Sequence, residues 1–144
     1  MKDKVAIVTG AGQGIGYAIV QELLARGVFV LLNDRDEGLA RKAASALGER
    51  CVAFAGDAGD VGFVRGLVKE AVRVFGRLDI AIANAGLTVF GDFFSYEPEM
   101  LEKVMQLNLA GSFFLAQAAA VQMRAQGEGG SILFMSSVTG HQAH

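Results

Sequence analysis

The stretch Val5-Ala-Ile-Val-Thr-Gly-Ala-Gly-Gln-Gly-Ile-Gly16 decides how the rest of this 144-residue chain is organised. Its apolar run, Val5 to Val8, is typical of a central parallel strand that is covered on both faces. Glycines follow at positions 10, 12, 14 and 16, and a helical pattern then continues towards Gly27. A strand, a glycine turn and a helix in this order present backbone N–H groups and a helix N-terminus to a phosphate group.

Glycine spacing alone leaves three interpretations of this stretch open. The turn fits a structural turn without a ligand, the glycine loop of a methyltransferase, or a dinucleotide site. In the helix that follows, Ile15, Ala18, Ile19 and Leu23 share one apolar face, as expected of a helix that covers a sheet. A dinucleotide site requires the turn to lie beside an acidic strand end, with backbone amides that the protein itself does not occupy.

Four further apolar runs predict strands at intervals of roughly 25 residues. They are Val28–Leu32, Cys51–Ala55, Leu78–Ala83 and Ser131–Met135, and helical patterns separate them. Alternating strands and helices imply βαβ units with right-handed crossovers. We therefore predict one α/β domain over residues 1–144, a doubly wound parallel sheet of Rossmann type. It has three α/β/α layers and the strand order 3-2-1-4-5, and the chain stops after the fifth strand.

The last predicted helix begins near Pro98, a residue well suited to a first helical turn, and runs to about Gln126. Its apolar content exceeds one buried stripe, so we expect residues 110–126 to pack on a second surface, that of another subunit in a homo-oligomer. The run Leu107–Met123 is interrupted by four polar residues, and we expect it to be too short and too polar to span a membrane. Phe90, Phe93 and Phe94 in the preceding loop fit a substrate entrance, or ordinary core or interface positions.

Composition excludes several classes of function. The net charge is −2 and no basic block is present, which gives nucleic-acid binding little electrostatic support. Cys51 is the single cysteine, so an internal disulfide is excluded and a reducing, cytoplasmic setting is expected. We expect no signal peptide ahead of the first strand, since Lys2, Asp3 and Lys4 lead directly into it. Two histidines and one cysteine provide no metal-ligand spacing, so we expect no metal site.

Asp34 ends the second strand about 20 positions after the glycines, where an acidic residue binds the adenosine ribose of a dinucleotide. Its carboxylate would repel a 2′-phosphate, which favours NAD over NADP. The neighbouring Arg35 is able to hold that phosphate, and a role of Asp34 as a helix cap or turn residue is the alternative interpretation.

The motifs around these residues resemble the short-chain dehydrogenase/reductase family. The glycine spacing after Thr9 is that of the family, and Asn84-Ala85-Gly86 is similar to its Asn-Asn-Ala-Gly motif, with Ala83 replacing the first asparagine. The resemblance covers Lys4 to Gly140 and implies an NAD site, in which Asp57 and the residue after it contact the adenine ring. The implied cofactor-binding residues are Gly10, Gly12, Gln13, Gly14, Ile15, Gly16, Asp34, Arg35, Asp57, Ala58, Asn84, Ala85 and Gly86.

The same resemblance implies two catalytic residues. Ser137, after the fifth strand, matches the serine that bonds the substrate carbonyl or hydroxyl, and Asn108 matches an asparagine that supports the proton relay. The family's general base, a tyrosine in Tyr-x-x-x-Lys, has no match, because Gln21 and Met100 stand four residues after the two tyrosines. We therefore expect the N-terminal part of a longer protein, or a truncated product, with an exposed fifth strand and little or no turnover.

These features predict an NAD-dependent oxidoreductase that moves a hydride between nicotinamide and a small-molecule secondary alcohol or ketone. A non-catalytic nucleotide-binding or assembly module is the alternative, since the base is missing and the long helix is apolar. A methyltransferase remains a third hypothesis, but it does not predict Thr9, Asn84-Ala85-Gly86 and Ser137 together.

Overall fold

The computed structural model describes residues 1–137, so the predicted motif residues beyond Ser137 lie outside the described part of the chain. Its elements are β1 (Val5–Val8), α1 (Gly14–Ala25), β2 (Phe29–Leu32), α2 (Glu37–Leu47), β3 (Cys51–Ala53), α3 (Val61–Phe75), β4 (Ile80–Ala83), η1 (Phe93–Ser95), α4 (Pro98–Met105), η2 (Gln106–Gly111), α5 (Ser112–Gln126) and β5 (Ser131–Phe134). The five strands are parallel in the order β3-β2-β1-β4-β5. This confirms the predicted doubly wound sheet.

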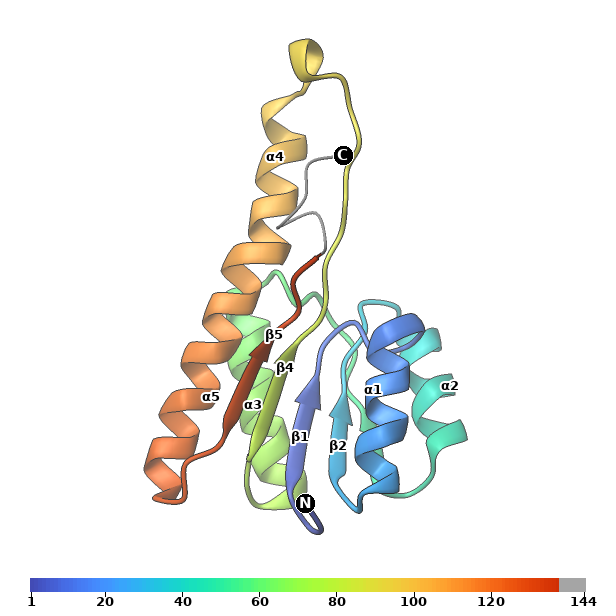
Figure 1. The fold of residues 1–144 in the computed structure, drawn as a ribbon, viewed down its shortest axis with the longest axis vertical. Helices are drawn as coiled ribbons and strands as arrows, with labels where there is room; N and C mark the ends of the chain where they lie inside the picture. The colour runs from blue at the N-terminus through green and yellow to red at the C-terminus, as the bar shows by residue number, and fades with distance from the viewer. Residues whose placement is uncertain (138–144) are drawn as a thin grey trace.

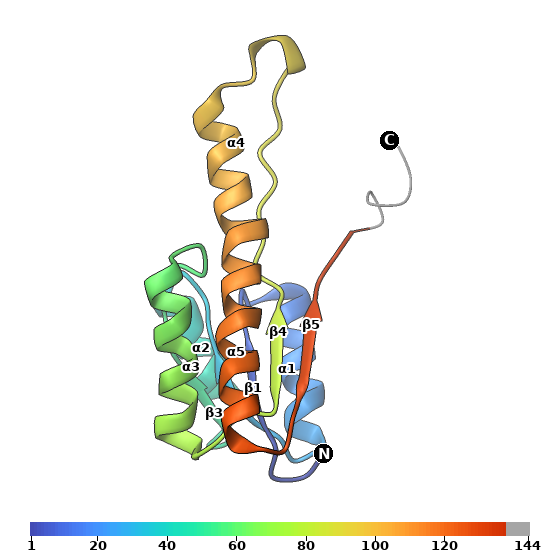
Figure 2. The same ribbon diagram turned by 90° about the vertical axis from the view of Figure 1, so that its left-hand side faces the viewer.

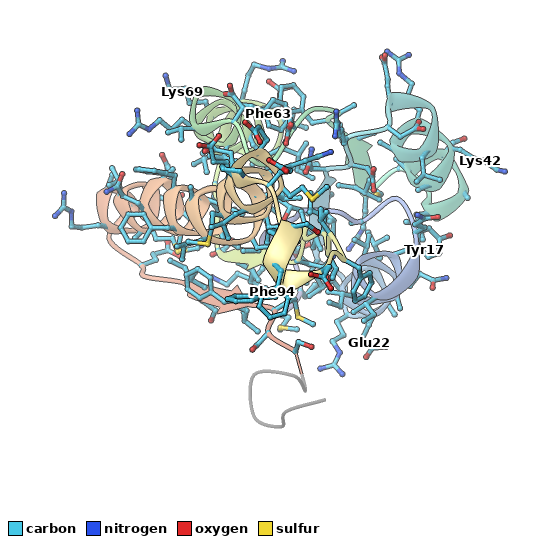
Figure 3. All side chains as sticks on the ribbon, turned by 90° about the horizontal axis from the view of Figure 1, so that it is seen from above. Tyr17, Glu22, Lys42, Phe63, Lys69 and Phe94 are labelled. Carbon is cyan, nitrogen blue, oxygen red and sulfur yellow. The ribbon has the colours of Figure 1, made fainter. Side chains whose placement is uncertain are left out.

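Helices cover both faces of the sheet, as Figure 1 shows. Successive side chains of a strand point to opposite faces, so β1 contributes to two cores. Ala6 and Val8 pack with α1 and α2, whereas Val5 and Ile7 pack with α3 and α5. Seen from above, Tyr17 and Lys42 belong to the α1–α2 layer, and Phe63 and Lys69 belong to α3 (Figure 3). The three-layer arrangement is that of the sequence prediction.

The buried face of α1 differs from the apolar face that the sequence suggested. Gly16, Val20 and Leu23 are buried, whereas Ile15 is 65% exposed and Ala18 is also exposed. Gly16 sets this face, because a Cβ there would lie 2.5 Å from the carbonyl oxygen of Gly10. Only glycine allows so close an approach of the helix to the turn, and the residues one and two turns further on then face the sheet.

Four strands are shorter than predicted: β2 begins at Phe29 and β5 ends at Phe134, a change of one residue each, and β3 and β4 each lose two residues. β3 ends at Ala53 rather than Ala55, although the N–H groups of Phe54 and Gly56 still donate to the carbonyls of Leu32 and Asp34 at 2.8 and 3.0 Å. β4 begins at Ile80 rather than Leu78. The backbone of Leu78 instead bonds the side-chain amide of Gln126. The N–H of Leu78 donates to Oε1 of Gln126 at 2.8 Å, and Nε2 of Gln126 donates to the carbonyl of Leu78 at 2.9 Å.

Residues 88–105, here called the arm, extend beyond the carboxyl edge of the sheet (Figure 2). The arm comprises the loop after β4, η1 and α4, and α4 continues through the π-helical segment η2 into α5. Phe90, Phe93 and Phe94 are 88–94% exposed, so they are not core residues in this structure. The predicted exposed edge is also present, because Leu133, Phe134 and Met135 are 43–57% exposed.

The helix from Pro98 to Gln126 has 29 residues. A stretch of 18 residues within it has a mean hydropathy of 1.4, and 17% of that stretch is buried inside the protein. By length and composition alone it could cross a membrane, so the expectation that this segment is too short was wrong. A helix that packs against protein passes the same test, and Leu115, Ala119 and Met123 belong to the core against α3.

Candidate functional site

A cavity of about 490 Å³ lies at the carboxyl ends of the strands, where ligands bind in doubly wound sheets. It is lined by Gly10, Gln13, Ile15, Gly16, Asn33, Asp34, Arg35, Gly56, Asp57, Ala58, Gly59, Asn84, Ala85, Gly86, Leu87, Lys103, Gln106 and Leu107. The chain connections bring these residues from four strand ends and from the continuous helix of α4 and η2. All the predicted cofactor residues except Gly12 and Gly14 line this one cavity.

The glycine turn brings β1 against two other strand ends. Gly10 has a φ of +62°, and a Cβ there would lie 2.8 Å from the Cα of Ala85. Gly12 does not line the cavity, and a Cβ there would lie 2.8 Å from Oδ2 of Asp34 and from Cγ of Leu39. Gly14, with a φ of +60°, begins α1. The turn therefore needs glycine for backbone conformation at two positions and for close packing at several.

The N-terminus of α1 lacks the cap that the two following helices have. Asp36 and Asp60 cap α2 and α3 by accepting from a backbone N–H, but Gln13 gives α1 no side-chain cap. Within residues 1–137, the N–H groups of residues 13–16 have no hydrogen-bond partner. These amides and the helix dipole form a site suited to an anion.

Two other amides of the turn are occupied by the protein. The N–H of Ala11 donates to the carbonyl of Asn33 at 2.8 Å, and that of Gly12 donates to Oδ2 of Asp34 at 2.9 Å. The second contact places the turn directly beside Asp34, as a dinucleotide site requires. The other carboxylate oxygen, Oδ1, accepts from the N–H of Asp36 at 3.2 Å. Each oxygen retains a lone pair, so the half-buried carboxylate can still accept bonds from a ribose diol.

Thr9 and Asn84 lock the ends of β1 and β4 together. The Nδ2 group of Asn84 donates to the carbonyls of Thr9 at 2.9 Å and Gly10 at 3.1 Å. In return, Oγ1 of the buried Thr9 accepts from the N–H groups of Asn84 and Ala85, both at 3.1 Å. This reciprocal set fixes the distance between the glycine turn and the Asn84-Ala85-Gly86 segment.

Asp57 and Ala58 line the opposite wall of the cavity. Oδ1 of Asp57 accepts from the N–H of Gly59 at 2.8 Å, which closes a local turn. The segment η2 packs directly on this turn, because a Cβ at Gly111 would overlap the carbonyl oxygen of Ala58. Nε2 of Gln106 donates to the carbonyl of Gly59 at 2.5 Å. The turn at residues 57–59 is therefore held by its own Asp57 side chain and by the residues of η2 that pack on it.

The two predicted catalytic residues do not line the cavity. Asn108 lies in η2, and its amide bonds the backbone of Leu87 in both directions at 2.9 Å. It thereby holds the chain next to Gly86. Ser137 lies three residues beyond the end of β5 and is exposed. Their predicted roles in the reaction stay predictions.

Sequence reasoning missed several residues of the cavity wall. Asn33, Lys103, Gln106 and Leu107 were not assigned a role, although all four line it. Lys103, Gln106 and Leu107 stand at positions i, i+3 and i+4 and therefore share one face of the helix. This spacing is the signal that would have found them. Within residues 1–137, no three His, Cys, Asp or Glu side chains gather into a group that would hold a metal ion.

Comparison with known proteins gives a consistent result. The family model "short chain dehydrogenase" matches residues 4–144. The chain is 36% identical over 143 residues to L-rhamnose 1-dehydrogenase (NAD(P)(+)) of Sphingomonas sp. (strain SKA58), covering 96% of this chain and 56% of that protein. It is 38% identical over 144 residues to the protein of the same name from Azotobacter vinelandii, with 95% and 56% covered.

A fungal relative is similar to the same degree. Versicolorin reductase 1 of Aspergillus parasiticus is 41% identical over 140 residues, which cover 94% of this chain and 52% of that protein. The chain thus spans about half the length of the curated relatives it matches.

Proposed function

This chain belongs to the short-chain dehydrogenase family, and we propose that it is the cofactor-binding part of an NAD-dependent oxidoreductase. The whole protein would transfer a hydride between nicotinamide and a secondary alcohol or ketone. The observation that carries the proposal is the row of unpaired amides at residues 13–16, in one cavity with Asp34. The names of the relatives include both dehydrogenases and reductases acting on different compounds, so no single substrate is proposed.

The residues present fit a dinucleotide along the cavity. The amides of residues 13–16 would bind the pyrophosphate, and Asp34 would accept hydrogen bonds from the adenosine ribose. Asp57 and Ala58 would face the adenine, and the backbone of residues 84–86 would lie beside the second ribose. When bound, NAD supplies the carbon that accepts or donates the hydride.

We propose a preference for NAD over NADP. The carboxylate of Asp34 would repel a 2′-phosphate at close range, and its bond to Gly12 fixes it in the cavity. Arg35 lines the same cavity and is the residue that opposes this preference. The nearby Arg41 is engaged by Glu37 at 2.5 Å, so it does not add an unpaired charge.

In the complete reaction, Ser137 would polarise the substrate carbonyl or hydroxyl, and Asn108 would support the proton relay. No Tyr-x-x-x-Lys motif occurs in the 144 residues. A positioned general base contributes roughly 10²- to 10⁴-fold to rate. This chain should therefore bind the cofactor with little or no turnover.

A non-catalytic nucleotide-binding or assembly module is the second candidate, favoured by the exposed apolar side chains of the long helix. Family membership leaves the methyltransferase hypothesis without support. Calorimetric titration with NAD, NADP and S-adenosylmethionine, followed by a panel of ketones with NADH, separates the candidates. Binding of NAD without turnover is expected for this chain, and tight binding of S-adenosylmethionine alone would overturn the oxidoreductase proposal. Turnover after fusion to a segment carrying Tyr-x-x-x-Lys would exclude the non-catalytic module.

We propose a cytoplasmic homo-oligomer that binds neither nucleic acid nor membrane. The single buried thiol of Cys51 and the net charge of −2 support this setting. Large apolar side chains on the outer side of the long helix, including Leu109 and Phe113, are 56–58% exposed and would pack against a second subunit.

A further inference from the structure

Asn33 is the most deeply buried uncharged amide side chain of the cavity wall. It follows the last residue of β2, is 1% exposed, and lines the cavity beside Asp34 and Gly56. Burying an amide costs free energy unless its groups are hydrogen-bonded, and an apolar residue would avoid that cost. Its presence at this strand end therefore requires a reason.

The NH₂ group of Asn33 connects the ends of two strands. Nδ2 donates to the carbonyls of Phe54 and Gly56, both at 3.0 Å, and makes a longer contact of 3.5 Å with the carbonyl of Asp34. Beyond Ala53 the N–H of Gly56 still donates to the carbonyl of Asp34 at 3.0 Å, and the bonds of the Asn33 side chain add to this backbone contact between the two strand ends. It joins the segment of Asp34 to the turn that leads into Asp57 and Ala58.

The backbone of Asn33 reaches the third part of the site. Its carbonyl accepts from the N–H of Ala11 in the glycine turn at 2.8 Å, and its N–H donates to the carbonyl of Val8 at 3.0 Å. One residue thus touches the turn predicted to hold the phosphates, the backbone of Asp34, and the wall predicted to hold the adenine.

The side-chain carbonyl of Asn33 adds a cost to this connection. Among residues 1–137, Oδ1 is the buried side-chain polar atom without a hydrogen-bond partner, a state that typically costs about 1–3 kcal/mol. Reversing the amide would place this oxygen against three carbonyl oxygens, so the orientation is fixed by the bonds of Nδ2. Within the described residues, Oδ1 of Asn33 therefore stays without a partner so that Nδ2 can keep its hydrogen bonds to the carbonyls of Phe54 and Gly56.

We propose that Asn33 is a positioning residue for the adenosine half of the nucleotide. Its NH₂ group, together with the backbone bond from the N–H of Gly56 to the carbonyl of Asp34, sets the separation between Asp34 and the turn at residues 56–58, and so shapes the space for ribose and adenine. This inference rests on the proposed function. It predicts that loss of the amide weakens adenosine binding and leaves the phosphate-binding turn unaffected, because Asn33 contacts that turn only through its backbone carbonyl.

Asn33→Leu tests the proposal, because leucine keeps similar volume and removes the amide. We expect the affinity for AMP and for NAD to fall at least tenfold, and that for inorganic pyrophosphate to change less than twofold. Gln126→Leu is the matched control: it removes an amide that bonds the backbone of Leu78 near the start of β4, away from the cavity. It should lower the melting temperature and leave AMP binding unchanged.

Each other outcome decides a different question. If the wild-type chain binds neither NAD nor AMP, the proposed function fails. If the wild type binds and Asn33→Leu retains AMP affinity within twofold, the positioning role is wrong. An equal loss of AMP and pyrophosphate would make Asn33 a structural residue only. If Asn33→Leu does not fold, Asn33→Ser is measured in the same way, and failure of both to fold also overturns the proposal.

Discussion

Individual residues of the cavity are constrained in different ways by their neighbours. Asp34 is constrained by what it binds, since Gly12 and Asp36 already donate to its two oxygens. Gly16 is constrained by what it excludes, since no side-chain atom fits beside the carbonyl of Gly10. Substitutions at these two positions should therefore fail for separable reasons, one chemical and one steric.

Replacing Asp34 with alanine should weaken NAD binding. Hydrogen bonds to a charged group contribute roughly 1.5–3 kcal/mol, which corresponds to roughly a 10- to 100-fold change in affinity. Binding of NADP should fall less, because the repulsion of its 2′-phosphate is also removed. Calorimetry with both nucleotides measures this change. Asp36→Ala is the control, since it removes the cap of α2 and should lower stability without changing the ratio of the two affinities.

Replacing Gly16 with alanine should destabilise the fold and abolish nucleotide binding. The new Cβ would lie 2.5 Å from the Gly10 carbonyl oxygen and 2.6 Å from Nδ2 of Asn84, and neither atom can move without breaking the turn. Overpacking of this kind costs roughly 1–3 kcal/mol.

The matched control is Gly66→Ala in α3, where no heavy atom lies within 4 Å of the added Cβ. Helix propensity predicts a gain of about 1 kcal/mol there. Urea unfolding of both variants gives the comparison, and similar effects at the two glycines would contradict the steric explanation.

At the scale of elements, the amino-terminal ends of the strands, opposite the cavity, are held together by a group of charged side chains around Asp79. Its carboxylate accepts from the N–H of Val5 at 2.9 Å, from Lys4 at 3.0 Å and from Arg77 at 2.6 Å, while Arg77 also pairs with Glu128. These contacts join the starts of β1 and β4 to the turn after α5. Burial acts to raise the pKa of Asp79, but the hydrogen bonds outweigh it and leave the pKa below its usual value.

The lowered pKa predicts loss of stability in acid. A carboxyl whose folded pKa lies below its unfolded value stabilises the protein above the unfolded pKa, about 3.9, and this contribution disappears as pH falls through the folded pKa. Asp79→Asn should cost on the order of 3 kcal/mol at pH 7 and flatten the decline in stability below about pH 4. Thermal unfolding from pH 7 to pH 2.5 measures both effects. The exposed Asp3→Asn should leave the acid profile unchanged.

At the scale of the whole molecule, the long helix joins the site to a large apolar surface. Segment η2 packs on the cavity wall at Ala58 and Gly59, while Met105, Leu109 and Phe113 are 45–58% exposed on the same continuous helix. A surface of this kind is covered by protein in most soluble molecules. Because η2 takes part in both, the proposed subunit contact and the cofactor site share one structural element.

Replacing Leu109 with serine should weaken self-association. Loss of the apolar contact at each of two symmetric positions shifts the equilibrium towards monomer, because burying a leucine side chain contributes about 1.5–3 kcal/mol. Light scattering at several concentrations measures the mass. Lys42→Glu on α2, on the far side of the sheet, is the control. A wild-type chain that is monomeric at all concentrations would exclude the proposed oligomer.

Sequence periodicity was sufficient for the sheet but not for every contact in it. The runs around Val5, Phe29 and Ile80 were recognised because buried parallel strands are continuous apolar segments, and their order followed from crossover rules. The face of α1 was not recoverable, because Ile15 has the hydropathy of a core residue and the position of Gly16 decides the orientation. The role proposed for Asn33 was also missed, since its partners lie 21 and 23 residues away.

The sequence by itself determined the fold class, the strand order, the family resemblance and most of the residues of the cavity. Those properties depend on local patterns: apolar runs, glycine spacing and the residues that end each strand. Only the tertiary structure decided which amides remain available, because Asp34 and Asn33 occupy those of Gly12 and Ala11, and the next four have no partner among residues 1–137. Hydrogen bonds between strand ends depend on distances set by packing of the whole sheet, and no local pattern records them.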